Sequence, residues 1–362
     1  MQKGASRRAA QKKTALNWWC IFGKITLTEH ILQTRDEHRL RPFSRRAGVR
    51  GRCKSLRLER ALCDFGIEHS FEKAGQRLRE HHGVALDASA ARAATYKHAA
   101  RAEQKLAAEY ARSHRELPAG QNATIIAEAD GSMLCTVPEG RARNSPRPRA
   151  WEEIRLLAAQ RQGSVETKYA ATFGSVQESG NRWGHVAKEA GRSLHSPIHP
   201  VCDGAEWIAL QIREIFGADA RALTDFYHVS EYLAAAAPRC RPQAPQAWRR
   251  TQHKRLKSGA AWKVIATLGE HREPAEAAEE NAPVRAAHRY LSNRAGTLDY
   301  QAALEAGLPI GSGLIESGHK HVLQARLKLP GAAWCKTNAQ TMAQLRVLRS
   351  NHRWHELWPL AA

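Results

Sequence analysis

Long uncharged apolar runs are missing from this 362-residue sequence. No segment reaches the roughly 18 to 20 uncharged apolar residues that a membrane-spanning helix needs. The apolar stretch at residues 15–27 contains Asn17, Cys20 and Lys24 and lacks a small-residue cleavage site, so it does not resemble a secretory signal. The sequence therefore predicts no transmembrane segment and no membrane partner.

Cysteine is scarce, and its spacing is irregular. The seven cysteines are an odd number and include no C-x-x-C pair. This pattern excludes a complete disulfide framework and a zinc ribbon. We therefore expect a protein of the reducing cytoplasm.

Acidic residues are outnumbered, and the excess of positive charge lies at the two ends. Lys and Arg number 56 against 35 Asp and Glu, a formal net charge of +21. Residues 1–60 carry a net +12 and residues 317–362 a net +6, whereas the 256 residues between them carry only +3. Two basic ends indicate surfaces for a polyanion, of which the DNA backbone is the usual one. The alternative is a solvated charge excess that serves solubility alone.

The length and the changes of pattern along the chain predict two or three folding units. Residues 1–55 lack clean periodicity and suggest a basic arm with some β structure. Helical spacing dominates residues 56–118. A second domain begins near residue 119, where the pattern changes to strands alternating with helices.

Residues 70–106 have the spacing of a helix-turn-helix. Ser70 and Asp87 stand where the caps of two helices are expected, and Ala74 and Leu78, four residues apart, predict a buried face. The second helix would present to a DNA major groove the residues of its first turns, which are Ser89, Arg92, Thr95, Tyr96 and Lys97. The alternative is an ordinary helical hairpin packed on another part of the protein.

The first acidic residue of interest lies in an alternating segment. Residues 122–137 alternate with a period of two around Asp130 and Gly131, so they predict a β-hairpin with an Asp-Gly turn. Glu128 shares a face with Asp130, as a helper or a competitor for any metal role. The alternative is that Asp130 only serves as a residue of the hairpin turn.

Further acids stand where predicted strands end or helices begin. Asp203 lies at a strand-to-helix junction, and Asp225 with His228 lies at the next one. Glu316 falls in the first turn of a helix that Gly311, Ser312 and Gly313 open. Taken singly, each acid is explained as a cap or a surface ion-pair residue.

Together, Asp130, Asp203 and Glu316 could bind divalent metal ions. Two divalent ions about 3.5 to 4 Å apart need several convergent carboxylates to offset their charge. Carboxylate oxygens select Mg²⁺, or Mn²⁺ as a substitute, over zinc. The three acids, 73 and 113 residues apart along the chain, therefore predict a two-metal site.

Several segments of the sequence resemble one family of enzymes. They are AEADGS, VCDGAEWI, LTDFYHVSEYL and above all GLPIGSGLIESGHKHVLQARLKLPGAAWCKTNAQTMAQLRVLRSN. These segments are similar to the DDE transposases of bacterial insertion sequences, specifically the ISKra type, which are distantly related to Mutator-like elements. The likeness covers about residues 20–358.

The resemblance implies an α/β fold with an RNase H-like core, a five-stranded mixed sheet with helices on both faces, preceded by the helix-turn-helix domain. The first part of this core would be residues 119–232. A mostly helical insertion would follow at residues 233–307. Residues 308–362 would complete the core with the Glu316 helix and basic C-terminal helices.

The resemblance also implies roles for individual residues. The catalytic, metal-binding acids of the family fall on Asp130, Asp203 and Glu316. Its Cys-or-Asp, two residues, His signature falls on Asp225 and His228, which we take to support the site rather than to hold metal.

The implied activity is cleavage of DNA at element ends and strand transfer into target DNA, in the bacterial cytoplasm at the nucleoid. Synapsis of two double-stranded ends implies a homo-oligomer. On the Glu316 helix, His319, Lys320 and Gln324 are expected beside the metals, where a phosphate would sit. Two other functions remain open: a DNA-binding regulator without chemistry, and a structure-selective nuclease with the same metal site.

Overall fold

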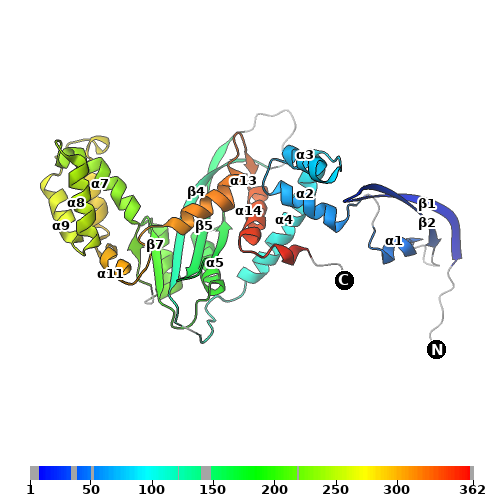
Figure 1. Ribbon diagram of the computed structural model, residues 1–362, viewed down its shortest axis with the longest axis horizontal. Helices are drawn as coiled ribbons and strands as arrows, with labels where there is room; N and C mark the ends of the chain where they lie inside the picture. Colours follow the sequence, from blue (N-terminus) through cyan, green and yellow to red (C-terminus); the bar gives the residue numbers. More distant parts are fainter. Residues whose placement is uncertain are drawn as a thin grey trace. The chain divides into compact units, whose positions relative to one another are not determined.

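The structure is a computed structural model of mixed α/β character (Figure 1), and it describes residues 8–33, 39–49, 53–120, 122–139, 148–217 and 220–358. The chain divides into two compact units. One comprises residues 1–103 with 353–362, and the other comprises residues 104–352. Helix α4 (Ala88–Tyr110) crosses from the first unit into the second.

The first unit begins with a long β-hairpin. Strands β1 (Arg8–Cys20) and β2 (Gly23–Gln33) pair antiparallel, and the short strand β3 (Arg39–Leu40) pairs with β2. Gly23 has a φ of +112°, which a glycine adopts without strain where the hairpin turns back. A short helix, α1 (Pro42–Arg46), follows. The basic arm, expected to hold some β structure, is therefore largely a hairpin within its described residues.

Three helices follow in the first unit, namely α2 (Leu56–Gly66), α3 (Phe71–His82) and α4. The predicted caps are confirmed: Ser70 Oγ accepts from the Lys73 N–H (3.3 Å), and Asp87 Oδ1 accepts from the Ala90 N–H (2.8 Å). The predicted buried face is confirmed as well, because Ala74 and Leu78 are inaccessible to solvent. They pack in one core with Leu58, Leu62, Val84, Ala91 and Ala94.

The second unit is built around a mixed sheet. Its strands are β4 (Ile125–Val137), β5 (Ala150–Arg161), β6 (Thr167–Thr172), β7 (Ile198–Cys202), β8 (Leu223–Thr224) and β9 (Trp334–Cys335). The order is β6-β5-β4-β7-β8, and β9 pairs with β4. Strands β4, β5 and β6 pair antiparallel, whereas β7 is parallel to both β4 and β8. The sheet is mixed, as expected, with six strands rather than five.

The predicted Asp130–Gly131 hairpin turn is wrong. Strand β4 runs straight through both residues, which pair with Leu156 and Arg155 of β5. The true antiparallel partner therefore lies about 20 residues further on. A Cβ at Gly131 would meet only the side chain of Glu153, whose carboxylate end can move aside.

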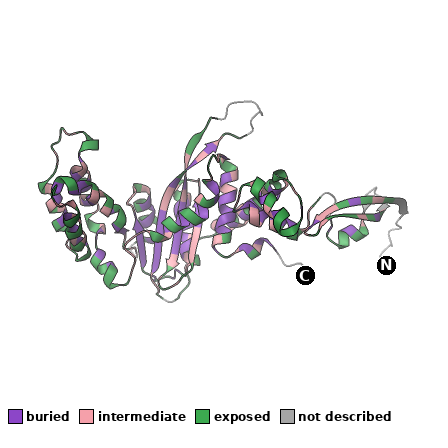
Figure 2. Ribbon diagram, turned by 45° about the horizontal axis from the view of Figure 1, so that its top comes forward, coloured by how far each residue is buried: buried purple, intermediate pink, exposed green. Residues whose placement is uncertain are grey.

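Helices cover both faces of the sheet. On one face, Ile125, Ala127 and Ala129 of β4 form an apolar core with α5 (Val176–Glu189), α6 (Glu206–Gln211) and the π-helix η1 (Ile212–Phe216). The opposite face receives a helix that starts as α12 (Gly313–Gly318), continues as the π-helix η5 (His319–Gln324) and ends as α13 (Ala325–Leu327). Helix α14 (Lys336–Ser350) packs against β6. Figure 2 shows the strands of this sheet as largely buried.

The segment expected to be a mostly helical insertion is helical. Its α-helices are α7 (Phe226–Cys240), α8 (Pro245–Lys257), α9 (Ala261–Glu270), α10 (Pro283–Ser292) and α11 (Tyr300–Glu305). Short 3-10 turns are η3 (Glu279–Asn281) and η4 (Ala295–Thr297), with η6 (Trp354–Leu357) near the end of the chain. The helices share a core that includes Leu233, Leu256, Leu268 and Leu291 and extends to Val201 of β7 and Leu223 of β8. Across all described residues, no helix combines the length and the apolar character needed to cross a bilayer.

Candidate active site

The register of the parallel strands brings two of the predicted acids to one level. Glu128 of β4 lies opposite Val201 of β7. Asp130 and Asp203 each follow two residues later, beyond the last pair of the parallel ladder, and both line one cleft.

Asp225 joins the same level from the next strand. Cys202 of β7 lies opposite Thr224 of β8, and Asp203 and Asp225 each follow directly. The carboxyl ends of parallel strands are where α/β sheets commonly bind ligands.

Glu316 comes to this place from the other end of the chain, on α12. A cleft of about 220 Å³ is lined by all three predicted catalytic acids and by the supporting pair. Its lining residues are Ala129, Asp130, Cys202, Asp203, Asp225, Tyr227, His228, Glu231, Ser312, Ile315 and Glu316. The cleft thus brings together residues that lie between positions 129 and 316 of the sequence.

Glu128 connects the central strand to the Glu316 helix. Its carboxylate is fully buried, and Oε2 accepts a hydrogen bond from the Ile315 N–H (2.8 Å) in the first turn of α12. Burial raises the pKa of the Glu128 carboxyl to about 8, and the charges of Asp225 and Glu316 act in the same direction against the backbone hydrogen bonds. Glu128 therefore holds the helix start, whereas Asp130 faces the cleft.

Asp225 has both oxygens occupied by the chain itself. Oδ1 accepts from the N–H groups of Tyr227 (2.6 Å) and His228 (3.1 Å), which caps α7. Oδ2 accepts from the Ser312 N–H (2.8 Å) and from its hydroxyl. Asp225 is 3% exposed and ties the start of α7 to the loop that precedes α12. The His228 ring stays partly exposed, and its Nδ1 lies 3.9 Å from Glu231 Oε2.

Asp203 lies in a tight turn that the helical insertion braces. Oδ1 accepts from the Ala205 N–H (2.9 Å), while the Tyr290 hydroxyl donates to the Asp203 carbonyl (2.6 Å). Arg294 donates to the Gly204 carbonyl (2.7 Å), and Gly204 has a φ of +84° that favours glycine. Sequence reasoning missed the roles of Tyr290 and Arg294 because they stand in no recognisable motif.

His319 lies beside a predicted metal ligand, as expected, but its side chain is buried. It is 5% exposed, and its Nε2 lies 3.1 Å from Asp130 Oδ2. The ring therefore lies against a predicted metal ligand, inside the protein, rather than on a surface that meets phosphate. Lys320 is exposed and Gln324 is partly buried on the same helix.

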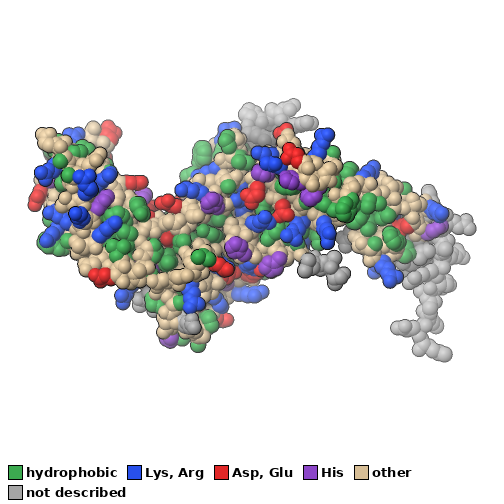
Figure 3. Space-filling model, in the orientation of Figure 1, with side chains coloured by type: hydrophobic (Ala, Val, Ile, Leu, Met, Phe, Trp, Pro, Cys, Tyr) green, Lys and Arg blue, Asp and Glu red, His purple; other side chains and the backbone are tan. Residues whose placement is uncertain are grey.

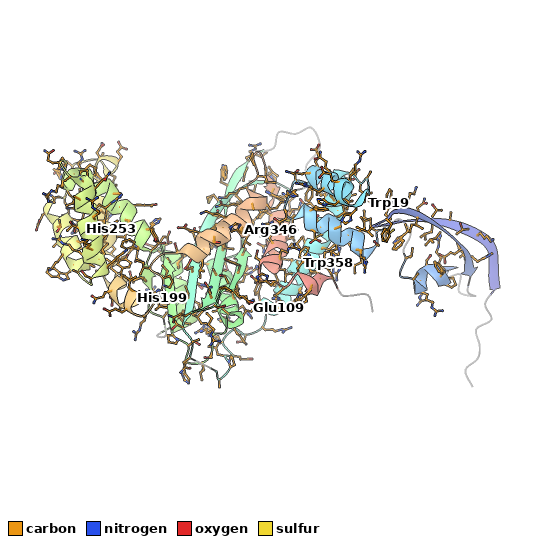
Figure 4. All side chains as sticks on the ribbon, in the orientation of Figure 1. Trp19, Glu109, His199, His253, Arg346 and Trp358 are labelled. Atoms are coloured by element: carbon orange, nitrogen blue, oxygen red, sulfur yellow. The ribbon has the colours of Figure 1, made fainter. Side chains whose placement is uncertain are left out.

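A π-helical segment shapes the helix beyond Glu316. Such segments are rare and often lie at functional sites. The buried side chain of Arg346 on α14 donates to two carbonyls of the segment: Nε to that of Val322 (2.5 Å) and Nη2 to that of His321. Figure 4 labels Arg346 and His199, whose Nε2 lies 2.8 Å from the Pro309 carbonyl oxygen. The helix is thereby fixed to the rest of the unit.

The donor set fits magnesium in type. Asp130 and Asp203 each accept a backbone N–H at Oδ1, and Asp130 Oδ2 also lies 3.1 Å from His319 Nε2. For Glu316, no hydrogen-bond partner is found within the part of the chain that the structure describes. As placed, however, no three His, Cys, Asp or Glu side chains of the described residues are close enough together to hold a metal ion. The acids share the cleft, and a bound cation would have to draw their side chains inward.

The residues predicted to meet DNA bases on α4 differ in exposure. Ser89 and Arg92 are exposed. Thr95 is fully buried, donates to the Ala91 carbonyl (2.8 Å) and does not fit a base-contacting role. Tyr96 is partly buried with its ring edge on Phe71, 5.4 Å between ring centres. Lys97 is exposed and donates to both oxygens of Glu59 (2.8 and 2.9 Å).

Comparison with known proteins assigns the chain to a protein family. The sequence matches no curated protein. Among solved structures, the Drosophila P element transposase strand transfer complex is similar at 8% identity, with 86% of this chain and 82% of that chain covered and a TM-score of 0.33. A likeness of this size does not establish a shared fold. Residues 54–356 match the model of the uncharacterised protein family UPF0236, and the chain therefore belongs to that family.

Proposed function

We propose that this protein is a DNA transposase of the DDE type, which cleaves the ends of an insertion sequence and joins them to target DNA. The observation that carries the proposal is the meeting of Asp130, Asp203 and Glu316 in one cleft. Acids that served only as turn or cap residues would not be expected to line the same cleft from three different elements. The motifs that resemble insertion-sequence transposases surround the same three acids.

In this proposal, the three acids hold two Mg²⁺ ions, or Mn²⁺ in their place. When bound, such a pair supplies activation of a water or 3′ hydroxyl and stabilisation of the departing 3′ oxygen. Glu128 and Asp225 position the acids, since each joins a sheet strand or its following turn to the Glu316 helix region. His319, next to Asp130, orients that carboxylate.

The proposal assigns DNA recognition to the first unit. Helices α3 and α4 would act as a helix-turn-helix, in which Ser89 and Arg92 are accessible for DNA contacts. The sheet and its helices would form an RNase H-like core interrupted by the helical insertion. Joining two element ends in one event requires at least two copies of the chain in the active assembly.

The test uses a plasmid that carries the genomic DNA on both sides of the gene, incubated with purified full-length protein and Mg²⁺. Wild-type protein is expected to cut at inverted repeats and to join the ends to a second plasmid. Asp203→Asn should abolish both reactions while binding to the repeats persists. Asp299→Asn, which keeps a capping side chain at the exposed start of α11, is the matched control and should react as wild type.

Each alternative has its own outcome in this experiment. Binding without any Mg²⁺-dependent cutting by the wild type would indicate a regulator. Cutting of branched DNA without joining would indicate a structure-selective nuclease. Normal cleavage by Asp203→Asn would show that the assignment of the acids is wrong.

A further inference from the structure

Helix α8 of the insertion carries an unbalanced positive charge. Between Glu231 and Glu270 the sequence contains eight Lys or Arg residues and no Asp or Glu. The following residues, 270–305, contain seven acids against four basic residues. Residues 232–305 together keep a net charge of +5, which the other residues between 61 and 316 lower to +3. A count over the middle of the chain therefore hides the basic part.

The charges of α8 are sorted onto one side of the helix. Trp248, Gln252 and Leu256, at intervals of four, form its buried side. Arg250, Lys254 and Lys257 are exposed and lie opposite that side at 100° per residue. We call these three the α8 basic face. Figure 3 shows Lys and Arg side chains gathered over the lobe of helices that contains α8.

Among the described residues, the α8 basic face has no carboxylate partner, since none of its three side chains forms an ion pair. By contrast, the exposed Arg289 of α10 bonds to both oxygens of Glu279 (2.9 and 3.2 Å). Three adjacent cations without a carboxylate repel one another, and an external anion relieves that cost.

The end of α8 lies beside the start of α7, next to the cleft. Lys257 Nζ is 4.7 Å from the centre of the Phe226 ring, and the His253 ring is 5.1 Å from it. Figure 4 labels His253 in this lobe. Phe226 directly follows Asp225, which lines the cleft. The basic face therefore starts near the predicted catalytic acids and extends about 10 Å away from them along α8.

We propose that the α8 basic face binds the phosphate backbone of double-stranded DNA that lies across the cleft. A duplex carries one charge per about 1.7 Å of its axis, so a row of cations of this length meets several phosphates. The inference rests on the proposed function for the DNA substrate. It adds a contact surface on the insertion that is separate from α4 and from the Glu316 helix.

The experiment measures binding of a fluorescein-labelled 40-base-pair duplex of arbitrary sequence to full-length protein over a series of salt concentrations. The variant Arg250→Gln/Lys254→Gln/Lys257→Gln is compared with Lys105→Gln/Lys168→Gln/Arg289→Gln. The second variant loses the same charge from cations that are already paired with Glu109, Glu166 and Glu279. The first should bind about 10- to 100-fold more weakly, and its slope of log K against log salt should be shallower by about 2 to 3.

The charge-preserving variant Arg250→Lys/Lys254→Arg/Lys257→Arg should restore both affinity and slope. Equal slopes for the two glutamine variants would overturn the inference, whatever the cleavage assay shows. If the wild type binds with the expected dependence on α8 but never cleaves, the proposed function fails and the DNA surface stands. Because Arg250, Lys254 and Lys257 are exposed, unchanged thermal unfolding is expected for the two α8 variants.

Discussion

The Glu128 carboxylate accepts a hydrogen bond from the Ile315 N–H over 2.8 Å, although 187 residues separate the two in the chain. Glu128 belongs to the central strand, two residues before Asp130. Ile315 directly precedes Glu316 on α12. One buried hydrogen bond thus couples the two elements that carry the first and the last of the predicted catalytic acids.

Two replacements of Glu128 should show whether its function is to accept the hydrogen bond from the Ile315 N–H or to carry a negative charge. Glu128→Gln keeps an oxygen for the Ile315 N–H, and the pKa of about 8 means that the native carboxyl is largely uncharged at pH 7. We expect cleavage within about threefold of wild type. Glu128→Ala leaves the N–H unpaired in a buried place and should lower stability by about 1–3 kcal/mol. A loss of cleavage of at least tenfold should accompany it, and equal activity of both variants would contradict the coupling.

Gly318 should tolerate no side chain. A Cβ at this position would lie 2.6 Å from Tyr169 Cε1 and 2.9 Å from Leu156 Cδ2, so Gly318→Ala must push α12 away from the sheet. We expect a loss of about 1–3 kcal/mol in unfolding free energy and weaker cleavage. Gly313→Ala is the matched control, because a Cβ there has nothing within 4 Å. Urea unfolding of both variants checks the prediction, which fails if they unfold alike.

Glu59 should anchor the first unit. Its carboxylate accepts from Lys97 Nζ and lies 2.9 Å from Nε2 of the fully buried His98, whose ring lies 4.2 Å from that of Trp358. Figure 4 labels Trp358 and Trp19, another residue of this unit. Glu59→Ala leaves two donors without an acceptor and should cost about 2–4 kcal/mol. Glu80→Ala, at the exposed Arg77–Glu80 pair, should cost less than about 1 kcal/mol. Hydrogen exchange of α2 and α4 would report the difference.

His114 should make the second unit less stable in mild acid. Burial, with His185, Arg115, Arg192 and Lys188 nearby, lowers the pKa of His114 to about 4. Between pH 6.5 and 4, His114 binds a proton in the unfolded chain but stays neutral in the folded protein. The free energy of unfolding therefore falls as the pH falls. Between pH 7 and 5 this loss is on the order of 1–2 kcal/mol.

His114→Gln should remove that part of the pH dependence. The exposed His271→Gln is the control and should keep it. The measurement is the difference in urea midpoint between pH 7 and pH 5 for each protein. An unchanged difference in His114→Gln would mean that the folded protein protonates His114 as readily as the unfolded chain.

Local features of the fold could be predicted because they depend on neighbouring residues. The caps at Ser70 and Asp87, the strand that ends before Asp203 and the helix that begins after Ser312 are all where the sequence indicated. Strand β5 was missed, since its sequence AWEEIRLLAAQR is rich in helix-forming residues. The Asp130–Gly131 turn was wrong for the complementary reason: pairing with β5 along its whole length outweighs the turn preference of two residues.

The sequence alone determined which side chains are available: three separated carboxylates, a capped pair of helices and a positive charge of +21. Only the tertiary structure decided which of them meet. Strand register aligned Asp130, Asp203 and Asp225, burial turned Thr95 and His319 inward, and helix packing sorted the charges of α8 onto one exposed side. Contacts between residues far apart in the sequence depend on the closure of long loops and on the packing of whole elements, which no local pattern of residues encodes.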